Sequence, residues 1–156
     1  MASKPGILAI WRRLARLPGG RWLFARLVCR KAPYFATIHP TVAELRPGHC
    51  EVRMGKRRAV LNHLGTVHAI AICNMAELAA GLVSDATVPV THRWIPKGMT
   101  VEYLRKAETD LRAVAELDLL PELGAKAEVP VYVNAFDTSG ESVFRATIRM
   151  WVSARH

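Results

Sequence analysis

The polar residues best suited to chemistry lie around the start of a long apolar stretch in the middle of this 156-residue chain. Asn62, Gly65 and His68 come first, and Glu77 follows among alanine and leucine residues. A carboxylate in such surroundings is costly to bury unless it is paired, protonated or used. Glu77 is therefore a candidate for a functional site. The alternative is a glutamate that reaches solvent or pairs with an arginine.

Metal and thiol chemistry find less support in the sequence. His63 and His68 lack the spacing of a zinc-binding His-Glu-x-x-His helix, and no acidic residue lies between them, so we predict no metal site. Cys73 lies in the apolar stretch and is expected to be a small core residue rather than a nucleophile. The chain has three cysteines, which are too few and too scattered for a disulfide framework, and this favours a reducing compartment.

A short basic run comes just before Asn62 and consists of Lys56, Arg57 and Arg58. It is either a solvated strand end or a contact for an anionic partner, such as the phosphates of coenzyme A or an acidic carrier protein. The sequence has no Gly-rich phosphate loop of the dinucleotide or P-loop kind. We expect no cofactor.

The elements that must position these residues follow from the hydrophobic pattern. Residues 67–83 form one predicted helix that is apolar on almost every side, which is typical of a helix in the middle of a fold. Alternating patterns before and after it predict antiparallel strands. The predicted strands are Tyr34–Ile38, Val42–Arg46, Cys50–Met54, His92–Leu104, Leu111–Leu117, Ala127–Phe136 and Ser142–Ala154. One buried helix and a run of antiparallel strands predict an α+β fold, a curved sheet wrapped around the helix.

The charge is distributed unevenly along the chain. Residues 1–60 hold 13 of the 22 basic side chains but only 2 of the 13 acidic ones, and eight basic residues and no acid lie within 1–31. The composition, 51% hydrophobic and 22% charged, excludes a disordered acidic chain. The length suits one main domain. We divide the chain into a basic amphipathic helical extension, 1–31, and a main domain, 32–156.

The extension is predicted to begin with a helix, Pro5–Leu17, capped by Ser3. Projected at 100° per residue, Ile7, Trp11 and Leu14 share one side, and three arginines at 12, 13 and 16 cluster opposite. A second segment, Arg21–Arg30, has an ambiguous period. The extension either lies on an anionic membrane surface or packs onto the domain with its arginines solvated. No recognisable nucleic-acid-binding motif occurs, and we expect no nucleic-acid partner.

No uncharged apolar run reaches the ~18 residues that would span a bilayer. The apolar run Gly6–Trp11 is short and has no cleavage site behind it, so we expect no secretory signal. We therefore expect a cytoplasmic protein, either free or in peripheral contact with the inner membrane face.

Two motifs resemble a known family. The run from Asn62 to His68, with Glu77 nine residues later, resembles the Asn-x-x-Gly-x-x-His-Gly-Gly…Asp/Glu signature of hotdog-fold acyl-CoA thioesterases of the PaaI-like group. The run Val-Glu-Tyr-Leu-Arg-Lys-Ala at 101–107 is similar to the Asp-Tyr-Leu-Arg-Pro-Ala strand of that group. The resemblance covers roughly Pro33–Ser153. It implies the hotdog fold, a curved antiparallel sheet around one long central helix.

The resemblance also implies roles for single residues. Glu77 would be the general base or nucleophile acting on a thioester, Asn62 would position the water or the carbonyl, and His68 would support the loop. The backbone N–H of Ala69 would polarise the thioester carbonyl at the helix N-terminus. Predicted substrate-binding residues are Gly65, Ile70, Arg57 and Arg58. The chain departs from the family at Ala69-Ile70, which replaces two glycines, and at Gly81, where some relatives have Ser or Thr.

Helix geometry adds an argument about assembly. Ala69 and Glu77 lie eight residues apart, so at ~1.5 Å per residue they are about 12 Å apart along one helix. Both contact one carbonyl only if they come from different subunits, which predicts a homodimer or a dimer of dimers. The expected activity is hydrolysis of an acyl-CoA or acyl-carrier-protein thioester. The alternatives are a non-catalytic acyl-thioester-binding protein, a dehydratase-like relative in which Glu77 is structural, and a module that binds a membrane surface or another anionic partner through the basic N-terminus.

Overall fold

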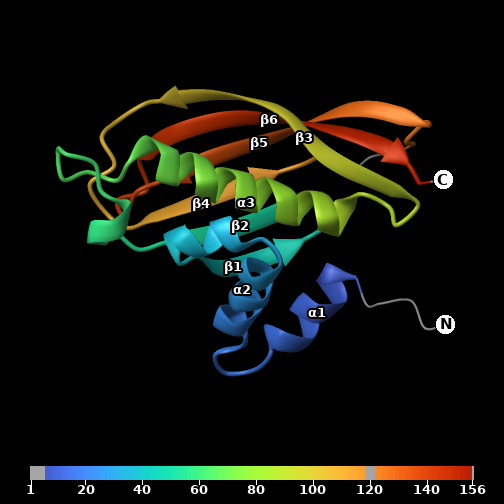
Figure 1. The fold of residues 1–156 in the computed structure, drawn as a ribbon, viewed down its shortest axis with the longest axis horizontal. Coiled ribbons are helices and arrows are strands. Elements are labelled where there is room, and N and C mark those ends of the chain that lie inside the picture. The colour runs from blue at the N-terminus through green and yellow to red at the C-terminus, as the bar shows by residue number, and fades with distance from the viewer. Residues whose placement is uncertain (1–5, 119–121, 156) are drawn as a thin grey trace.

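The computed structural model describes residues 6–118 and 122–155, which form a six-stranded sheet with a long helix across one face (Figure 1). Two further helices lie beside one edge of the sheet. In chain order the elements are α1 (Ile7–Leu14), α2 (Gly20–Lys31), η1 (Pro33–Ile38), β1 (Thr41–Arg46), β2 (His49–Met54), η2 (Arg58–Val60), α3 (Ala69–Thr87), β3 (His92–Tyr103), β4 (Leu111–Glu116), β5 (Lys126–Phe136) and β6 (Ser142–Ala154).

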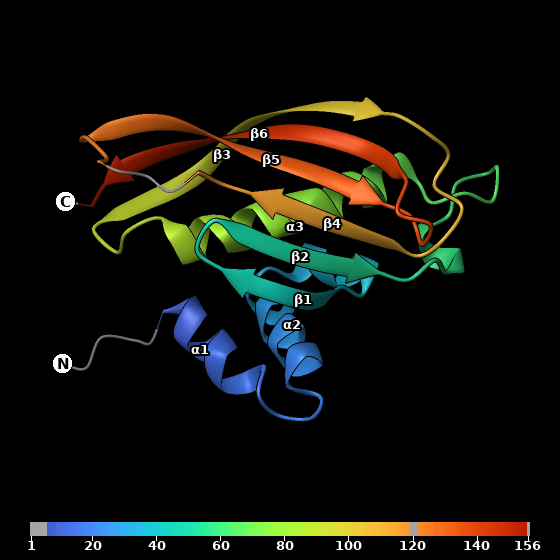
Figure 2. The same ribbon diagram turned by 180° about the vertical axis from the view of Figure 1, so that it is seen from behind.

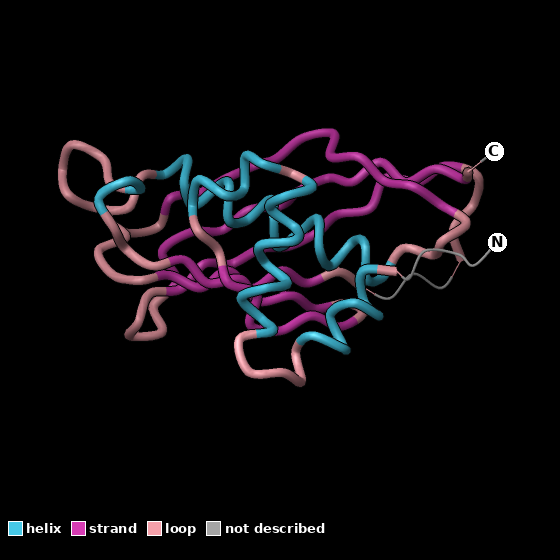
Figure 3. The backbone as a smooth tube through the Cα atoms, turned by 60° about the horizontal axis from the view of Figure 1, so that its bottom comes forward, coloured by secondary structure: helices cyan, strands magenta, loops and turns pink. Residues whose placement is uncertain are grey.

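The strand order in the sheet is β1-β2-β4-β5-β6-β3, and all the neighbouring pairs are antiparallel. β1 and β3 therefore form the two edges. α3 lies across one face of the curved sheet, in front of it in Figure 1 and behind it in Figure 2. Figure 3 shows the helices gathered on one side of the strands. The predicted α+β architecture, a curved antiparallel sheet around one long helix, is confirmed.

The core lies between α3 and the sheet face that it covers. Along β4 the residues alternate, with Leu111, Ala113 and Ala115 buried on the helix side. Alternation of this kind marks a strand with one face against the core. By length and hydropathy alone α3 could cross a bilayer. More than half of its residues are buried in the fold, including Met75 and Val83.

Three predicted elements differ from the structure in type or by more than one residue at an end. Tyr34–Ile38 is not a strand but part of the 3₁₀ helix η1, which begins at Pro33 because a proline fits the first turn of a helix. The central helix spans Ala69–Thr87 rather than 67–83, because His68 caps it and Val67 forms an isolated bridge with Leu61. α1 ends at Leu14, and the predicted cap Ser3 and start Pro5 lie outside the described residues.

The two N-terminal helices pack beside β1 (Figure 2). Trp11 of α1 and Phe24 of α2 are buried in the same hydrophobic core as α3, and their rings meet edge to face with centroids 5.1 Å apart. Such a contact adds to the stabilisation from burying both rings. The apolar side of α1 is thus used in packing on the domain. The boundary after residue 31 stays a prediction.

Candidate functional site on the open face of α3

α3 turns one stripe of residues away from the sheet. Its members recur every three or four positions, the spacing of one helix face. They are Ile70, Cys73, Glu77, Gly81 and Asp85, all exposed or half-buried. Glu77 is exposed in the single chain, as in the alternative of a glutamate that reaches solvent. The stripe looks apolar in the sequence because most of its members are small or aliphatic.

The first turn of α3 leaves one backbone donor free. His68 caps the helix, since its Nδ1 accepts a hydrogen bond from the Ile70 N–H at 3.1 Å. Its carbonyl accepts from the amides of Ala71 and Ile72 at 3.0 and 3.2 Å. The Ala69 amide has no acceptor among the residues that the structure describes. A free N–H at a helix N-terminus, on the positive end of the helix dipole, favours a negatively charged oxygen.

Asn62 shapes the loop that leads into α3. Its side-chain oxygen accepts hydrogen bonds from the amides of Leu64 and Thr66, at 2.9 and 3.2 Å, and its amide donates to the Thr66 hydroxyl at 2.8 Å. Gly65 completes the turn with a φ of +76°, a conformation that glycine adopts without steric cost. The hydrogen bonds of the Asn62 side chain therefore all lie within its own loop, and Gly65 supplies the backbone conformation of the turn.

The two predicted phosphate-binding arginines lie in different surroundings. The Arg57 guanidinium donates to the backbone carbonyl of Thr37, and the Thr37 hydroxyl accepts from the Asn74 side chain at 3.1 Å. These bonds connect η1, α3 and the segment before η2. Arg58 is exposed. Sequence reasoning did not find the links through Thr37, because the two partners lie 20 and 37 residues away in the chain.

Two aromatic residues of β3 flank the stripe. The Tyr103 hydroxyl lies 3.9 Å from the Cys73 sulfur. The Trp94 indole N–H donates to Asp85 at 2.8 Å, and its ring lies so close to Gly81 that a Cβ there would be 3.2 Å from it. Tyr103 falls within the predicted motif, whereas no signal in the sequence pairs Trp94 with α3. The contact with Trp94 gives a physical reason for glycine at position 81.

The groups at the stripe suit acid–base rather than thiolate chemistry. Burial raises the pKa of the Cys73 thiol, which disfavours the thiolate needed for attack. Glu77 has no ion pair or hydrogen bond to another described residue. Within residues 6–118 and 122–155, no three His, Cys, Asp or Glu side chains gather in a way that could hold a metal ion. A carboxylate and a free amide are thus the chemical groups that α3 presents.

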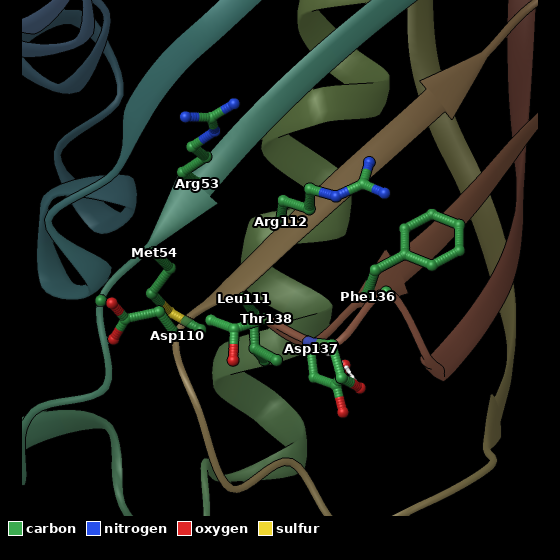
Figure 4. Close-up of a pocket in the computed structure, with 11 residues that line it drawn as sticks. Arg53, Met54, Asp110, Leu111, Arg112, Phe136, Asp137 and Thr138 are labelled. Atoms are coloured by element: carbon green, nitrogen blue, oxygen red, sulfur yellow. Dashed lines mark hydrogen bonds between the residues drawn. The ribbon is translucent and has the colours of Figure 1, made fainter.

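A separate open pocket of about 550 Å³ lies on the opposite face of the sheet from α3 (Figure 4). Arg53 and Arg112 project into it from β2 and β4, and the Arg112 guanidinium lies 4.4 Å from the centre of the Phe136 ring. The Glu51 carboxylate forms an ion pair with Arg53, with 2.8 Å between Oε1 and Nε. Its other oxygen lies 3.8 Å from a guanidinium nitrogen of Arg112. The pocket contains none of the predicted site residues.

Comparison with known proteins places this geometry in a family. A family profile described as a domain of unknown function, DUF4442, matches residues 20–152. A crystal structure from structural genomics is 47% identical, with a TM-score of 0.82, over 96% of this chain and 99% of that chain. A Pseudomonas aeruginosa protein of unknown function, a probable thioesterase, is 25% identical, with a TM-score of 0.78, over 89% and 97% of the two chains. A thioesterase family protein from Silicibacter pomeroyi shares the fold at 20% identity, with a TM-score of 0.71, over 84% and 96%. No curated protein matches the sequence at a significant level.

The match to the family profile includes every element from α2 to β5 and most of β6, and so it covers the Asn62 loop and the stripe on α3. The solved structures confirm the hotdog fold and the resemblance found in the two motifs. The chain therefore belongs to the DUF4442 family and has the hotdog fold of thioesterase family proteins.

Proposed function

We propose that this protein is a thioesterase that hydrolyses an acyl-CoA or acyl-carrier-protein thioester. The observation that carries the proposal is that α3 presents both a free amide, at Ala69, and an accessible carboxylate, at Glu77. The fold likeness to a probable thioesterase supports the reaction class. The arrangement supplies both groups that thioester hydrolysis needs, a donor for the carbonyl oxygen and a base for water.

In the proposed reaction the thioester carbonyl oxygen accepts a hydrogen bond from the Ala69 N–H. Glu77 takes a proton from a water molecule while the water oxygen bonds to the carbonyl carbon. The negative charge that develops on the carbonyl oxygen is stabilised by the amide and the positive end of the α3 dipole. The carbon–sulfur bond then breaks, and the thiolate leaves with the proton that Glu77 holds. The products are a carboxylic acid and a thiol.

The proposed site needs two subunits. α3 runs without interruption through both residues, so about 12 Å along its axis separates Ala69 from Glu77. β3 offers a place for the second copy, because this 12-residue strand forms a free edge of the sheet. Unpaired edge strands favour pairing with another chain. Met99 and Tyr103, on the α3 side of β3, are exposed in the single chain. A dimer through β3 brings the partner subunit's Glu77 toward Ala69.

The proposed substrate carries negative charge, on the phosphates of coenzyme A or on an acidic carrier protein. Arg58 and Lys56 are the exposed members of the basic run before the Asn62 loop, and the Arg58 guanidinium can contact coenzyme A phosphates or an acidic carrier protein. Arg57 instead donates to the Thr37 carbonyl and so connects the segment before η2 to η1, which Asn74 in turn connects to α3. No cofactor is proposed beyond the coenzyme A that forms part of the substrate.

The proposal is tested by assaying thioester hydrolysis across a series of acyl-CoA chain lengths. Glu77→Gln keeps the size of the side chain and removes its basicity, so kcat is expected to fall by roughly 100-fold or more. Asp85→Asn is the matched control, because it neutralises another carboxylate of the same stripe. Wild-type turnover by Glu77→Gln would show that this carboxylate is not the base. An inactive wild type on every thioester would favour a protein that binds acyl thioesters without hydrolysing them.

A further inference from the structure

We propose that the exposed face of α2, together with the turn before it, docks on an anionic lipid bilayer. We call this surface the α2 face; it consists of Leu17, Trp22, Leu23, Arg26, Leu27 and Arg30. This inference does not depend on the proposed thioesterase activity. It concerns a different edge of the molecule.

The α2 face is apolar where a soluble helix is usually polar. Leu17, Trp22, Leu23 and Leu27 are 57%, 59%, 42% and 45% exposed. The opposite side of α2 is anchored in the core, where Phe24 is fully buried. The helix therefore cannot turn to bury these side chains within the same chain. Apolar side chains gathered in this way on an anchored helix mark an interaction surface.

The charge around these apolar residues selects the partner. Residues 1–31 hold eight basic side chains and no acidic one. On α2 the arginines lie between the apolar residues, and the Arg26 guanidinium lies over the Trp22 ring, 5.8 Å from its centre. Arg30 is exposed, as are Arg12 and Arg13 of α1 and Arg16 in the turn after it. Tryptophan and leucine interleaved with arginine are typical of helices that lie in the interface of an anionic membrane.

The packing of α1 changes which helix inserts into the membrane, compared with the contact that the sequence suggests. The amphipathic pattern favours insertion of the apolar side of α1, but Trp11 of that side is buried in the core. α1 can then contribute only its arginines, as electrostatic contacts. The side chains that insert are Leu17 and the apolar residues of α2. In the sequence, the hydrophobic period of the α2 segment is ambiguous.

The position of the α2 face leaves it open in the proposed dimer. α2 packs on β1, and β1 and β3 are the two opposite edges of the sheet (Figure 1). Pairing through β3 therefore does not cover the α2 face. A nucleic acid is a poorer partner for the surface, because Leu23 and Leu27 offer a phosphate backbone neither charge nor a hydrogen bond.

The proposal is tested by sedimenting the full-length protein with vesicles of equal parts phosphatidylglycerol and phosphatidylcholine, and with vesicles of phosphatidylcholine alone. Binding is expected to the anionic vesicles and to weaken as salt is added. Leu23→Ser/Leu27→Ser and Arg16→Gln/Arg30→Gln should each reduce the apparent affinity by roughly ten-fold or more. Val90→Ser/Tyr132→Ser is the matched control, because it removes two exposed apolar side chains outside the helices.

Tryptophan fluorescence gives a second measurement on the same samples. Trp22 is the most exposed of the four tryptophans, so insertion should shift the emission to shorter wavelength. Trp22→Phe keeps an apolar ring, and it should retain binding while losing most of the shift. Equal sedimentation with both vesicle types overturns the proposal, as does wild-type binding by Leu23→Ser/Leu27→Ser. Loss of the dimer in that variant would instead identify a second copy as the occupant, and preferential binding to nucleic acid would also overturn the membrane assignment.

Discussion

Asn62 shows how one side chain can matter to a site through the loop that it stabilises. Its three hydrogen bonds to Leu64 and Thr66 hold the loop that delivers the chain to His68 and α3. Asn62→Ala should therefore reduce the free energy of unfolding by about 2 kcal/mol, since partly buried partners lose their bonds. Urea unfolding measures this change. Asn62→Asp keeps both acceptor contacts and should lose less than half as much; equal losses in the two variants would contradict the loop-shaping role.

Motif spacing predicted where the candidate residues lie in the fold better than it predicted their surroundings. Ala69, His68 and Glu77 lie on or next to the same helix, as their spacing requires. The sequence left a buried and a solvent-exposed Glu77 as alternatives, because small and aliphatic neighbours such as Gly81 make an open helix face look like a buried one. The bond between Arg57 and Thr37 joins elements whose proximity only the folded chain establishes.

At the scale of elements, the alternation of apolar and polar residues predicted a strand correctly where one face of that strand lies against the core. β4 alternates along its whole length and β6 alternates from Phe144 to Val152, and both strands lie within the predicted ranges. The pattern failed over Tyr34–Ile38, because five residues are too few to distinguish a strand from the 3₁₀ helix that Pro33 begins. α2 extends one residue beyond the predicted segment Arg21–Arg30 at each end, and the period of that segment was ambiguous because the exposed side of α2 carries leucine and tryptophan.

A hydrogen bond from Trp94 to Asp85 connects β3 to the end of α3. Partial burial raises the pKa of Asp85 above its ordinary value of 3.8, although this hydrogen bond and the charges of Lys31 and Arg155 oppose the change. The ordinary pKa applies to Asp85 in the unfolded chain, and the raised pKa applies to it in the folded protein. Between these two pKa values the folded protein binds more protons than the unfolded chain, so the contribution of Asp85 to stability falls as the pH rises through that window.

Asp85→Asn should remove this pH dependence, because an asparagine oxygen still accepts from Trp94 but carries no charge. The stability of the variant relative to the wild type is expected to increase as the pH rises from below 3.8 toward neutral. Urea unfolding of both proteins across this range measures the difference, and Asp85→Ala serves as the variant without an acceptor. A relative stability that falls with rising pH would contradict the assignment.

At the scale of the whole molecule, the two edges of the sheet are suited to different contacts. β3 leaves a long strand unpaired beside the stripe of α3, whereas β1 is covered by the basic α1 and α2. A dimer through β3 would place the proposed sites at its centre and the α2 faces at its ends. Catalysis and membrane contact could then be altered independently, so substitutions in the α2 face should leave hydrolysis of a short soluble thioester unchanged.

Ala69 allows the shared site to be tested with little structural disturbance. It is the first residue of α3, a position where proline is favoured, and His68 has the extended backbone that precedes a proline. Ala69→Pro thus deletes the proposed donor N–H while preserving the helix. The loss of one such donor is expected to lower kcat by roughly 100-fold or more, and Ala69→Ser, which retains the N–H, is the control.

Combining Ala69→Pro with Glu77→Gln in one dimer distinguishes a shared site from a site within one chain. Each variant alone is expected to be nearly inactive. If the two carry different affinity tags and the mixed dimer is purified through both, one of its two sites joins an intact Ala69 to an intact partner subunit's Glu77, and the other site has neither group. The mixed dimer should therefore recover about half of the wild-type kcat, because a two-fold symmetric interface makes two equivalent sites. A site built within one chain would leave both sites of the mixed dimer defective, so a mixed dimer as inactive as its parents would refute the shared arrangement.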